Sequence, residues 1–226
     1  MAMGGLAYHV LNRAVGRATL FEKRADFQAF EIVLEQAWKR FGTRIACYCV
    51  MPNHWHMVLW PRTDDELSHF MRWLTVTHSQ RRHAHYQSAG TGPVYQGRFK
   101  SFPIERDHHF LTVCRYVERN ALNANLVKRA EDWQWGSLWR RRNQKRAERA
   151  FLQEPEEWPV QPPRNWLAVV NRAQPHEELK ALRRSAGRGA PFGSERWQLR
   201  IAAKLGLEST LRPRGRPPRP KVEPAR

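Results

Sequence analysis

Cysteine is scarce in this sequence, and neither a membrane span nor a signal peptide is evident. The three cysteines, Cys47, Cys49 and Cys114, are an odd number, and their spacing does not resemble a zinc knuckle. They favour buried or half-buried thiols in a reducing, cytoplasmic protein over a disulfide framework. The opening MAMGGLAYHV lacks the hydrophobic region of a signal peptide. No apolar run reaches the roughly 18 residues that a membrane span needs, so we expect no membrane partner.

Acidic residues are also scarce, since 21 aspartates and glutamates face 39 lysines and arginines, for a formal net charge of +18. A charge of this size predicts binding to a polyanion, most often nucleic acid. A ribosome-bound or merely basic protein is the alternative. Membrane-surface binding is disfavoured because the basic runs lack long apolar partners. The length of 226 residues, 41% of them hydrophobic, suits one compact domain with extensions.

Hydrophobic spacing predicts strands and helices over the first 120 residues. Residues 26–41 are apolar at helical spacing, with Asp26 as the expected N-cap and Gly42 as the end. Further helices are expected at 64–86 and from Asp107 onward. Strands are expected at 7–15, 44–52, 54–61 and 94–104. This order predicts an α+β fold, with a largely antiparallel sheet and helices on one face.

The character of the chain changes after about residue 122. The basic run at 140–149 is interpreted as either a solvated helix or a DNA contact, and 155–163 as a proline-rich linker. Residues 176–208 are expected to form two helices. We therefore divide the chain into a domain at 1–150, a linker and basic helical extension at 151–210, and a basic tail at 211–226. The tail has low complexity and is expected to be disordered.

Two histidines stand in an apolar stretch at 51–60, MPNHWHMVLW. Residues i and i+2 of a strand share a face, so His54 and His56 would point one way while Trp55 and Met57 point the other. Such a pair has two explanations, a metal site or a polar network. The spacing favours the metal, because neutral imidazole is a common metal ligand. No HxHxDH or HExxH motif of a zinc hydrolase is present.

A second histidine pair, His83 and His85, falls in a predicted helix. Residues i and i+2 of a helix diverge by about 200°, so these two rings would not converge on one ion. Their neighbours include Arg81 and Arg82. A solvated or phosphate-facing role is therefore expected for this pair.

The segment CRYVERN places Tyr116 and Asn120 four residues apart, on one face of the expected third helix. From spacing alone, Tyr116 is most simply a tyrosine at the edge of the core, and Asn120 a residue at the helix end. They are nonetheless the candidates to complete a site with the first histidine pair.

Several basic side chains are candidates for contact with a nucleic acid. Arg98 and Lys100 alternate in the expected strand at 94–104 and so share a face. Arg13 and Arg17 could line the same groove. Ordinary surface charge is the alternative for each of them.

Several segments, in this order along the chain, resemble the REP-associated tyrosine transposases, bacterial members of the single-tyrosine HUH superfamily (His-hydrophobe-His). The resemblance covers nearly the whole chain and implies a ferredoxin-like HUH sandwich. The segments are YHVLNRAVGRATLF, MPNHWHMVLW, VYQGRFKSFPI, FLTVCRYVERNALNANLV, AEDWQWGSL and LGLESTLRPRGRP.

The resemblance also implies a role for each matched residue. His54, His56 and Asn120 correspond to the metal ligands, although wider relatives often have glutamine at the third position. Tyr116 corresponds to the nucleophile. The implied cofactor is a divalent metal, Mg²⁺ or Mn²⁺. Because all three ligands are neutral, the ion would keep its full charge for phosphate oxygens.

The implied activity is nicking and strand transfer of single-stranded DNA at hairpin-forming palindromic repeats, through a 5′-phosphotyrosine. A tyrosine ester keeps the energy of the cut bond for rejoining. Arg115 and Arg119, beside Tyr116, could contact DNA and favour the phenolate. The implied partners are single-stranded and hairpin DNA, bound by a monomer or homodimer in the bacterial cytoplasm, at the nucleoid.

Two other functions are alternatives. An HUH replication initiator or relaxase would use the same chemistry, but relaxases usually place the tyrosine before the histidines, and initiators usually carry lysine where Arg119 stands here. A non-catalytic protein that only occupies repeats is the second alternative.

The tail segment PRGRP, with Arg214 and Arg216, resembles a minor-groove AT-hook. A phosphate-binding or autoinhibitory tail competes with that interpretation.

Overall fold

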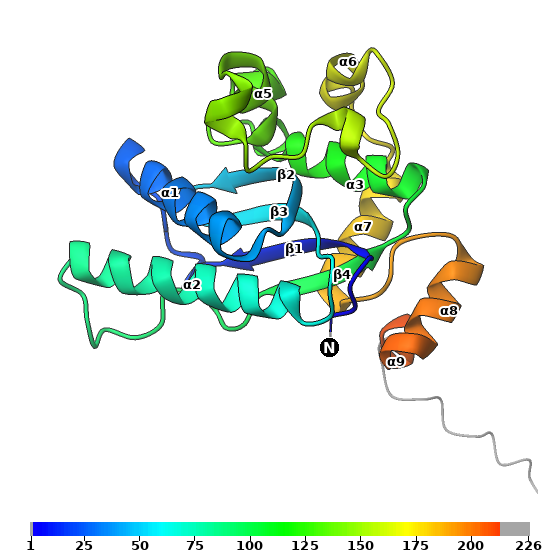
Figure 1. The fold of residues 1–226 in the computed structure, drawn as a ribbon, viewed down its shortest axis with the longest axis horizontal. Coiled ribbons are helices and arrows are strands. Elements are labelled where there is room, and N and C mark those ends of the chain that lie inside the picture. The colour runs from blue at the N-terminus through cyan, green and yellow to red at the C-terminus, as the bar shows by residue number, and fades with distance from the viewer. Residues whose placement is uncertain (1, 213–226) are drawn as a thin grey trace, which may run out of the picture.

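The first part of the chain forms a four-stranded antiparallel sheet with two long helices (Figure 1). The computed structural model describes residues 2–212. The strand order is β2-β3-β1-β4, with each neighbouring pair antiparallel. A βαββαβ chain with this order is ferredoxin-like, so the predicted α+β class and antiparallel sheet are confirmed. The elements are β1 (Ala7–Arg13), α1 (Arg24–Phe41), β2 (Arg44–Met51), β3 (His54–Trp60), α2 (Glu66–His85) and β4 (Lys100–Ile104).

The second part of the chain is helical, and the two helices expected within 176–208 are present as α7 and α8. Figure 1 shows α5 and α6 beyond the β2 edge of the sheet, whereas α1 and α2 lie across one of its faces. The helices are α3 (His108–Glu118), α4 (Asn120–Asn123), α5 (Ser137–Asn143), α6 (Trp166–Asn171), α7 (His176–Arg188), α8 (Glu195–Leu205) and α9 (Glu208–Leu211). Short 3-10 turns are η1 (Val15–Arg17), η2 (Ala130–Asp132), η3 (Arg146–Arg149) and η4 (Pro155–Glu157).

One face of the sheet is covered by α1 and α2 in an aromatic layer. Trp55 and Met57 of β3 pack in one buried cluster with Phe30 of α1 and Phe70 of α2. All four side chains are buried. This face is therefore an apolar core, and the orientation predicted for Trp55 and Met57 is confirmed.

The opposite face is covered by α3, with help from the C-terminal region. Val113 and Val117 of α3 cluster with Cys47 and Val58 of the sheet, and Leu182 of α7 joins them. The expectation of helices on one face therefore holds only for α1 and α2. The physical reason lies in β2 and β3, which are buried almost throughout and would expose apolar side chains under a one-sided layer. All three cysteines are buried free thiols, as predicted.

Two element boundaries differ from the predictions. Helix α1 begins at Arg24, so Asp26 lies in its first turn, where its carboxylate accepts two backbone N–H groups at 2.9 Å. Strand β4 begins at Lys100 instead of residue 94, because a bend at 96–98 interrupts it. Asn12 supports this bend, since its side-chain amide donates to the Gly97 carbonyl at 3.2 Å.

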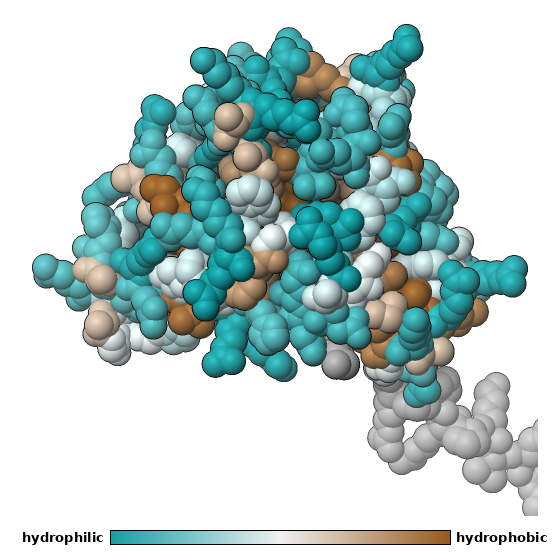
Figure 2. Space-filling view, viewed as in Figure 1, coloured by the Kyte–Doolittle hydropathy of each residue, from teal (hydrophilic) through white to brown (hydrophobic). Residues whose placement is uncertain are grey.

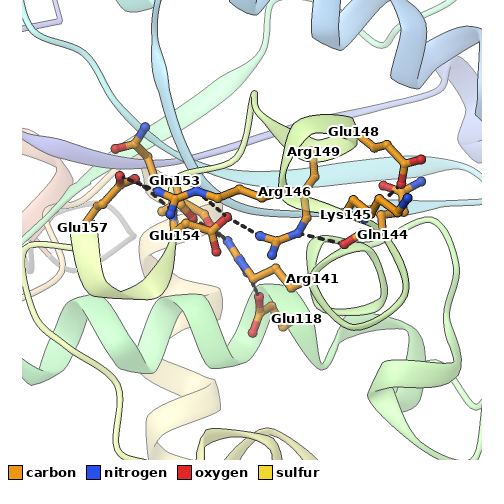
Figure 3. A network of polar contacts seen from close by, with 11 residues as sticks. Glu118, Arg141, Gln144, Lys145, Arg146, Glu148, Arg149, Gln153, Glu154 and Glu157 are labelled. Carbon is orange, nitrogen blue, oxygen red and sulfur yellow. Dashed lines mark hydrogen bonds and ion pairs between the residues drawn. The ribbon is translucent and has the colours of Figure 1, made fainter.

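The basic run at 140–149 contains arginines that hold the fold together (Figure 3). Arg141 pairs with Glu118 of α3 at 2.7 Å, and the two side chains are only 10% and 0% exposed. Arg149 pairs with Glu154, both largely buried. These arginines are structural, so for them both interpretations of the run, as a solvated helix and as a DNA contact, are wrong.

At the boundary predicted near residue 150, the chain is still packed against the sheet. Leu152 bridges to Ile45 and joins the α1–α2 core. Trp158 and Phe192 join the α3-side core. The division into domains therefore stays a prediction. Within residues 2–212, no helix combines the length and apolarity that crossing a membrane requires. Figure 2 shows a largely hydrophilic surface on the side in view, with small separate hydrophobic patches.

Candidate active site

A cavity of about 570 Å³ lies on the α3 side of the sheet. Its wall is made by β1, β3, the loop before β4, the α3–α4 segment and α7. These segments are far apart in sequence, and the fold brings most of the predicted site residues together here. The predicted residues in the wall are Arg13, His54, His56, Arg98, Lys100, Tyr116 and Asn120.

Strand β3 presents His54 and His56 to this cavity, with ring centroids 5.0 Å apart and planes at 84°. His54 Nδ1 lies 2.6 Å from Asn53 Oδ1, so Nδ1 carries the proton and Nε2 keeps its lone pair. Burial, with a smaller contribution from Arg13, lowers the pKa of His54 to about 4. Burial, with His9 and His54 nearby, lowers the pKa of His56 well below its ordinary value. Both rings are therefore neutral at pH 7.

His9 of β1 is a buried partner of this pair that no sequence motif marked. Its Nε2 lies 2.9 Å from Nδ1 of His56, and the two rings stack with centroids 5.0 Å apart. Burial lowers the pKa of His9 to about 3, so the contact joins two neutral rings. Strand alternation contained the signal, because Tyr8 and Val10 point into the α1–α2 core and His9 must face the other way.

Tyr116 reaches the cavity from α3, whose apolar stripe packs on the sheet. Its ring centroid lies 5.7 Å from that of His56, with the planes at 87°. Burial raises the pKa of Tyr116, while the positive charge of Arg183, the Asn120 side chain and the charge of Arg13 act in the opposite direction. The phenol is thus half-buried beside two cations.

Asn120 lies just beyond α3, as the first residue of α4. Arg119 between the two helices has a right-handed helical backbone, with φ −83° and ψ −6°, so the helical path continues. The Asn120 side chain is buried and lines the cavity together with Tyr116. The shared face predicted from the spacing of four is therefore observed.

Three of the predicted basic residues, Arg13, Arg98 and Lys100, line the cavity. Within residues 2–212, none of the three takes part in an ion pair. Their charges therefore remain uncompensated by the protein. Arg17 is exposed in η1 and is not part of the cavity wall. Arg214 and Arg216 lie outside the described residues.

Arg115 and Arg119 do not line the cavity, although they flank Tyr116 in sequence. The Arg115 guanidinium donates to the carbonyl of Arg172 at 2.7 Å. The Arg119 guanidinium donates to the carbonyl of Val170 at 3.0 Å. Arg115 thus ties the α6–α7 connection to α3, and Arg119 ties the end of α6 to it, which is a structural use of their charge.

Two other histidine groups do not form a comparable site. His83 and His85 diverge on α2 as expected, and Nδ1 of His83 contacts a serine hydroxyl at 3.0 Å. Asp107, His108 and His109 lie close together at the start of α3. Asp107 is already used there, because it accepts the backbone N–H of His109 at 2.8 Å. The positive end of the helix dipole also disfavours a cation at this position.

The arrangement in the cavity defines what it can do chemically. The two imidazoles and the Asn120 amide are neutral donors, suited to a cation that must keep its charge for an anionic substrate. The phenol is a nucleophile once deprotonated. Uncompensated arginine and lysine side chains bind phosphate groups. Neutral donors that could hold a cation, a phenol and cationic side chains therefore line one cavity.

Sequence comparison assigns the family. A family model described as "Transposase IS200 like" matches residues 2–120, more than half of the chain. The chain therefore belongs to the IS200-like transposase family. The matched residues include the whole sheet, both cavity histidines, Tyr116 and Asn120. No curated protein sequence matches the chain.

Among solved structures, the chain is similar to a REP-associated tyrosine transposase bound to a REP hairpin. The two share 17% identity and a TM-score of 0.54, over 68% of this chain and 86% of that one. This likeness shows a common fold. A putative transposase from Deinococcus radiodurans R1 matches with 16% identity and a TM-score of 0.39, over 50% of this chain and 88% of that one.

Proposed function

We propose that this transposase cuts and rejoins single-stranded DNA through a covalent bond between Tyr116 and a 5′-phosphate, next to a divalent cation. The observation that carries the proposal is the Tyr116 ring, 5.7 Å from that of His56 in a cavity that Asn120 also lines. A nucleophile and a cation site this close can act on the same phosphate.

Mg²⁺ or Mn²⁺ would be held by His54, His56 and Asn120. Both imidazoles fit, because Nδ1 of each is already engaged, by Asn53 and by His9, which leaves Nε2 for a metal. For His56 this requires His9 to accept the Nδ1 proton through its own Nε2. When bound, the ion supplies positive charge to the phosphate oxygens and to the leaving oxygen.

Tyr116 would act as the nucleophile. Its phenolic oxygen loses its proton and forms a bond to phosphorus, the bond from phosphorus to the 3′-oxygen breaks, and that oxygen takes up a proton to become a 3′-hydroxyl, so no net proton is gained or lost. The phosphotyrosine retains the energy of the broken bond, so a second 3′-hydroxyl can reverse the step and join a new strand. The charges of Arg183 and Arg13 favour the phenolate against the effect of burial.

The substrate would be single-stranded DNA at the foot of a hairpin formed by a palindromic repeat. Arg13, Arg98 and Lys100 give the cavity a cationic wall that suits a DNA backbone. The solved relative was bound to a REP hairpin, and we extend this class of substrate to the present chain. The protein would act as a monomer or homodimer, at the nucleoid.

A Tyr116→Phe substitution tests the nucleophile. Incubated with hairpin oligonucleotides and Mn²⁺, the wild type should form an adduct that survives denaturing electrophoresis. Tyr116→Phe should form none and still bind the hairpin, because only the attacking oxygen is removed. Tyr86→Phe is the matched control, since Tyr86 bonds Asp26 outside the cavity, and it should keep the adduct. A wild type that binds DNA without any adduct would be a non-catalytic repeat-binding protein.

The cation is tested separately. His54→Ala, His56→Ala and chelation with EDTA should each abolish cleavage, whereas His85→Ala should leave it intact. Asn120→Ala should raise the metal concentration required rather than abolish cleavage, because an amide oxygen is a weak single ligand. Full cleavage in EDTA would disprove the metal assignment.

A further inference from the structure

Helix α7 contributes one wall of the cavity, although it lies beyond residues 2–120 of the family match. It brings Arg183, Ala186 and Gly187 into the cavity wall. Arg183 and Gly187 are four residues apart and therefore share a helical face. This face combines one long cation with two small residues.

The position of α7 is fixed at both ends. Before the helix, the Arg115 guanidinium of α3 donates to the carbonyls of Arg172 and Ala173, at 2.7 and 3.0 Å. After the helix, Phe192 pairs with β4, donating its N–H to the Pro103 carbonyl at 2.9 Å. Leu182, next to Arg183, is buried in the α3-side core. The backbone that carries Arg183 is thus held against α3 and β4.

Arg183 differs from its arginine neighbours on the same helix. The side chains of Arg184 and Arg188 donate to the carbonyls of Leu211 and Ser209, both at 3.0 Å, and so hold α9. Arg183 has no ion-pair partner anywhere in the described chain, 2–212. Its charge acts on Tyr116 across the cavity.

We propose that Arg183 is a catalytic residue that binds a non-bridging oxygen of the phosphate attacked by Tyr116. This role rests on the proposed function. In the reaction, the phosphate gains charge on its non-bridging oxygens as the phenolic oxygen approaches, and a guanidinium can donate two hydrogen bonds to them. Arg183 and Arg13 then hold the phosphate from opposite parts of the chain, α7 and β1.

The small residues on α7 leave space for the DNA strand beside Arg183. A Cβ atom placed on Gly187 would meet no atom within 4 Å. Ala186 also carries only a methyl group toward the cavity wall. A backbone phosphate can therefore approach the guanidinium without displacing α7.

The first test compares Arg183→Gln with Arg183→Lys. Single-turnover cleavage is measured at saturating hairpin DNA and saturating Mn²⁺. Arg183→Gln should be slower by about 10- to 100-fold, the usual effect of one charged donor to a developing anion. Arg183→Lys should recover part of this loss. Arg184→Gln removes the same charge one residue away, outside the cavity, and should cleave at the wild-type rate.

The second test asks whether Arg183 meets the phosphate that is cut. In a Tyr116→Phe background, which cannot cleave, hairpin affinity is measured with a phosphodiester or a neutral methylphosphonate at the mapped cleavage position. Arg183→Gln should weaken binding of the phosphodiester by about 10-fold and leave that of the methylphosphonate almost unchanged. Equal losses for both linkages would place the interaction at another phosphate and overturn the proposal.

The outcomes separate this inference from the proposed function. If the wild type forms the adduct and Arg183→Gln cleaves at the wild-type rate, the inference fails while the proposed function stands. A loss confined to affinity, with an unchanged saturated rate, also overturns it. If the wild type forms no adduct at all, the proposed function itself fails.

Discussion

The molecule contains two sets of arginines that its sequence does not distinguish. Arg140 and Arg141 of α5 are held by Glu31 and Glu118, at 2.5 and 2.7 Å, in an interior network. Arg13 and Arg183, at the cavity, have no such partner within the described chain. The difference lies in where the few carboxylates are placed. A buried charge requires a partner within the protein, whereas a charge at an open cavity can remain unpaired until a ligand binds.

Histidines divide in the same way. His78 of α2 is buried, and its Nδ1 contacts the hydroxyl of Tyr95 at 2.8 Å within the aromatic layer. His54 and His56 are also neutral, but they line the cavity. The candidate site therefore consists of groups whose bonding capacity is not used by the fold.

The largest expected effect comes from breaking the structural set. Arg141→Gln should lower the free energy of unfolding by about 3–5 kcal/mol, because it leaves the fully buried Glu118 carboxylate without its cation. Denaturant unfolding measures this change. Cleavage at a temperature where the variant is folded should stay within a few-fold of the wild type.

Arg13→Gln is the matched change in the cavity set, and it should do the reverse. Its unfolding free energy should change by no more than about 1 kcal/mol, while hairpin binding and cleavage weaken. If Arg13→Gln destabilises the fold as much as Arg141→Gln, the cavity arginines stabilise the fold as the interior arginines do, and the two sets have the same role.

A smaller effect is expected from His9, which belongs to the cavity set only through His56. His9→Phe keeps a ring in the buried space but removes the nitrogen that lies 2.9 Å from Nδ1 of His56, which the proposed metal site requires as a proton acceptor. The Mn²⁺ concentration for half-maximal cleavage should rise by about 10- to 100-fold, with activity restored at high metal. His9→Asn, which retains an acceptor, should show a smaller rise. An unchanged metal requirement in His9→Phe would make His9 a packing residue only.

The structural histidine should be visible in the dependence of stability on pH. Burial, with Arg82 nearby, lowers the pKa of His78 to about 4, below the value of about 6.5 in the unfolded chain. Its neutral form is therefore favoured by folding, so stability is lost as pH falls from about 6.5 toward 4. Between pH 7 and pH 5 this group should account for about 1–2 kcal/mol. His78→Gln should reduce the loss of unfolding free energy over that range by this amount. A loss identical to that of the wild type would show that His78 does not contribute to the pH dependence.

The sequence predicted the elements that depend on local spacing. The i, i+2 rule placed His54 and His56 opposite Trp55, and this held because β3 is buried on both faces. The spacing of four placed Tyr116 and Asn120 on one face, and this held because the backbone at Arg119 stays helical.

The sequence did not predict interactions between distant segments. His9 meets His56 because β1 and β3 are neighbours in the sheet, and no local pattern reports this pairing. Arg183 is 67 positions after Tyr116 and enters the cavity on α7, whose preceding residues are bonded by Arg115. The interpretation of the run at 140–149 as a solvated or DNA-binding segment is wrong for Arg140, because its carboxylate partner, Glu31, lies 109 positions earlier in the chain.

The smallest expected effect concerns the basic tail, whose Arg214 and Arg216 lie outside the described residues. Deleting residues 213–226 should flatten the salt dependence of hairpin binding, by roughly 0.7–0.9 in logarithmic slope for each phosphate that the tail neutralises in the full-length protein. Cleavage at low salt and saturating DNA should persist, because Tyr116, His54 and His56 line the cavity and lie outside the deleted segment. If PRGRP enters a minor groove, Arg214→Ala with Arg216→Ala should weaken binding most on A·T-rich duplex flanks. If the arginines meet only phosphates, binding should weaken equally on A·T-rich and G·C-rich flanks. Faster cleavage after truncation would instead show an autoinhibitory tail, and would place these arginines in neither of the two sets.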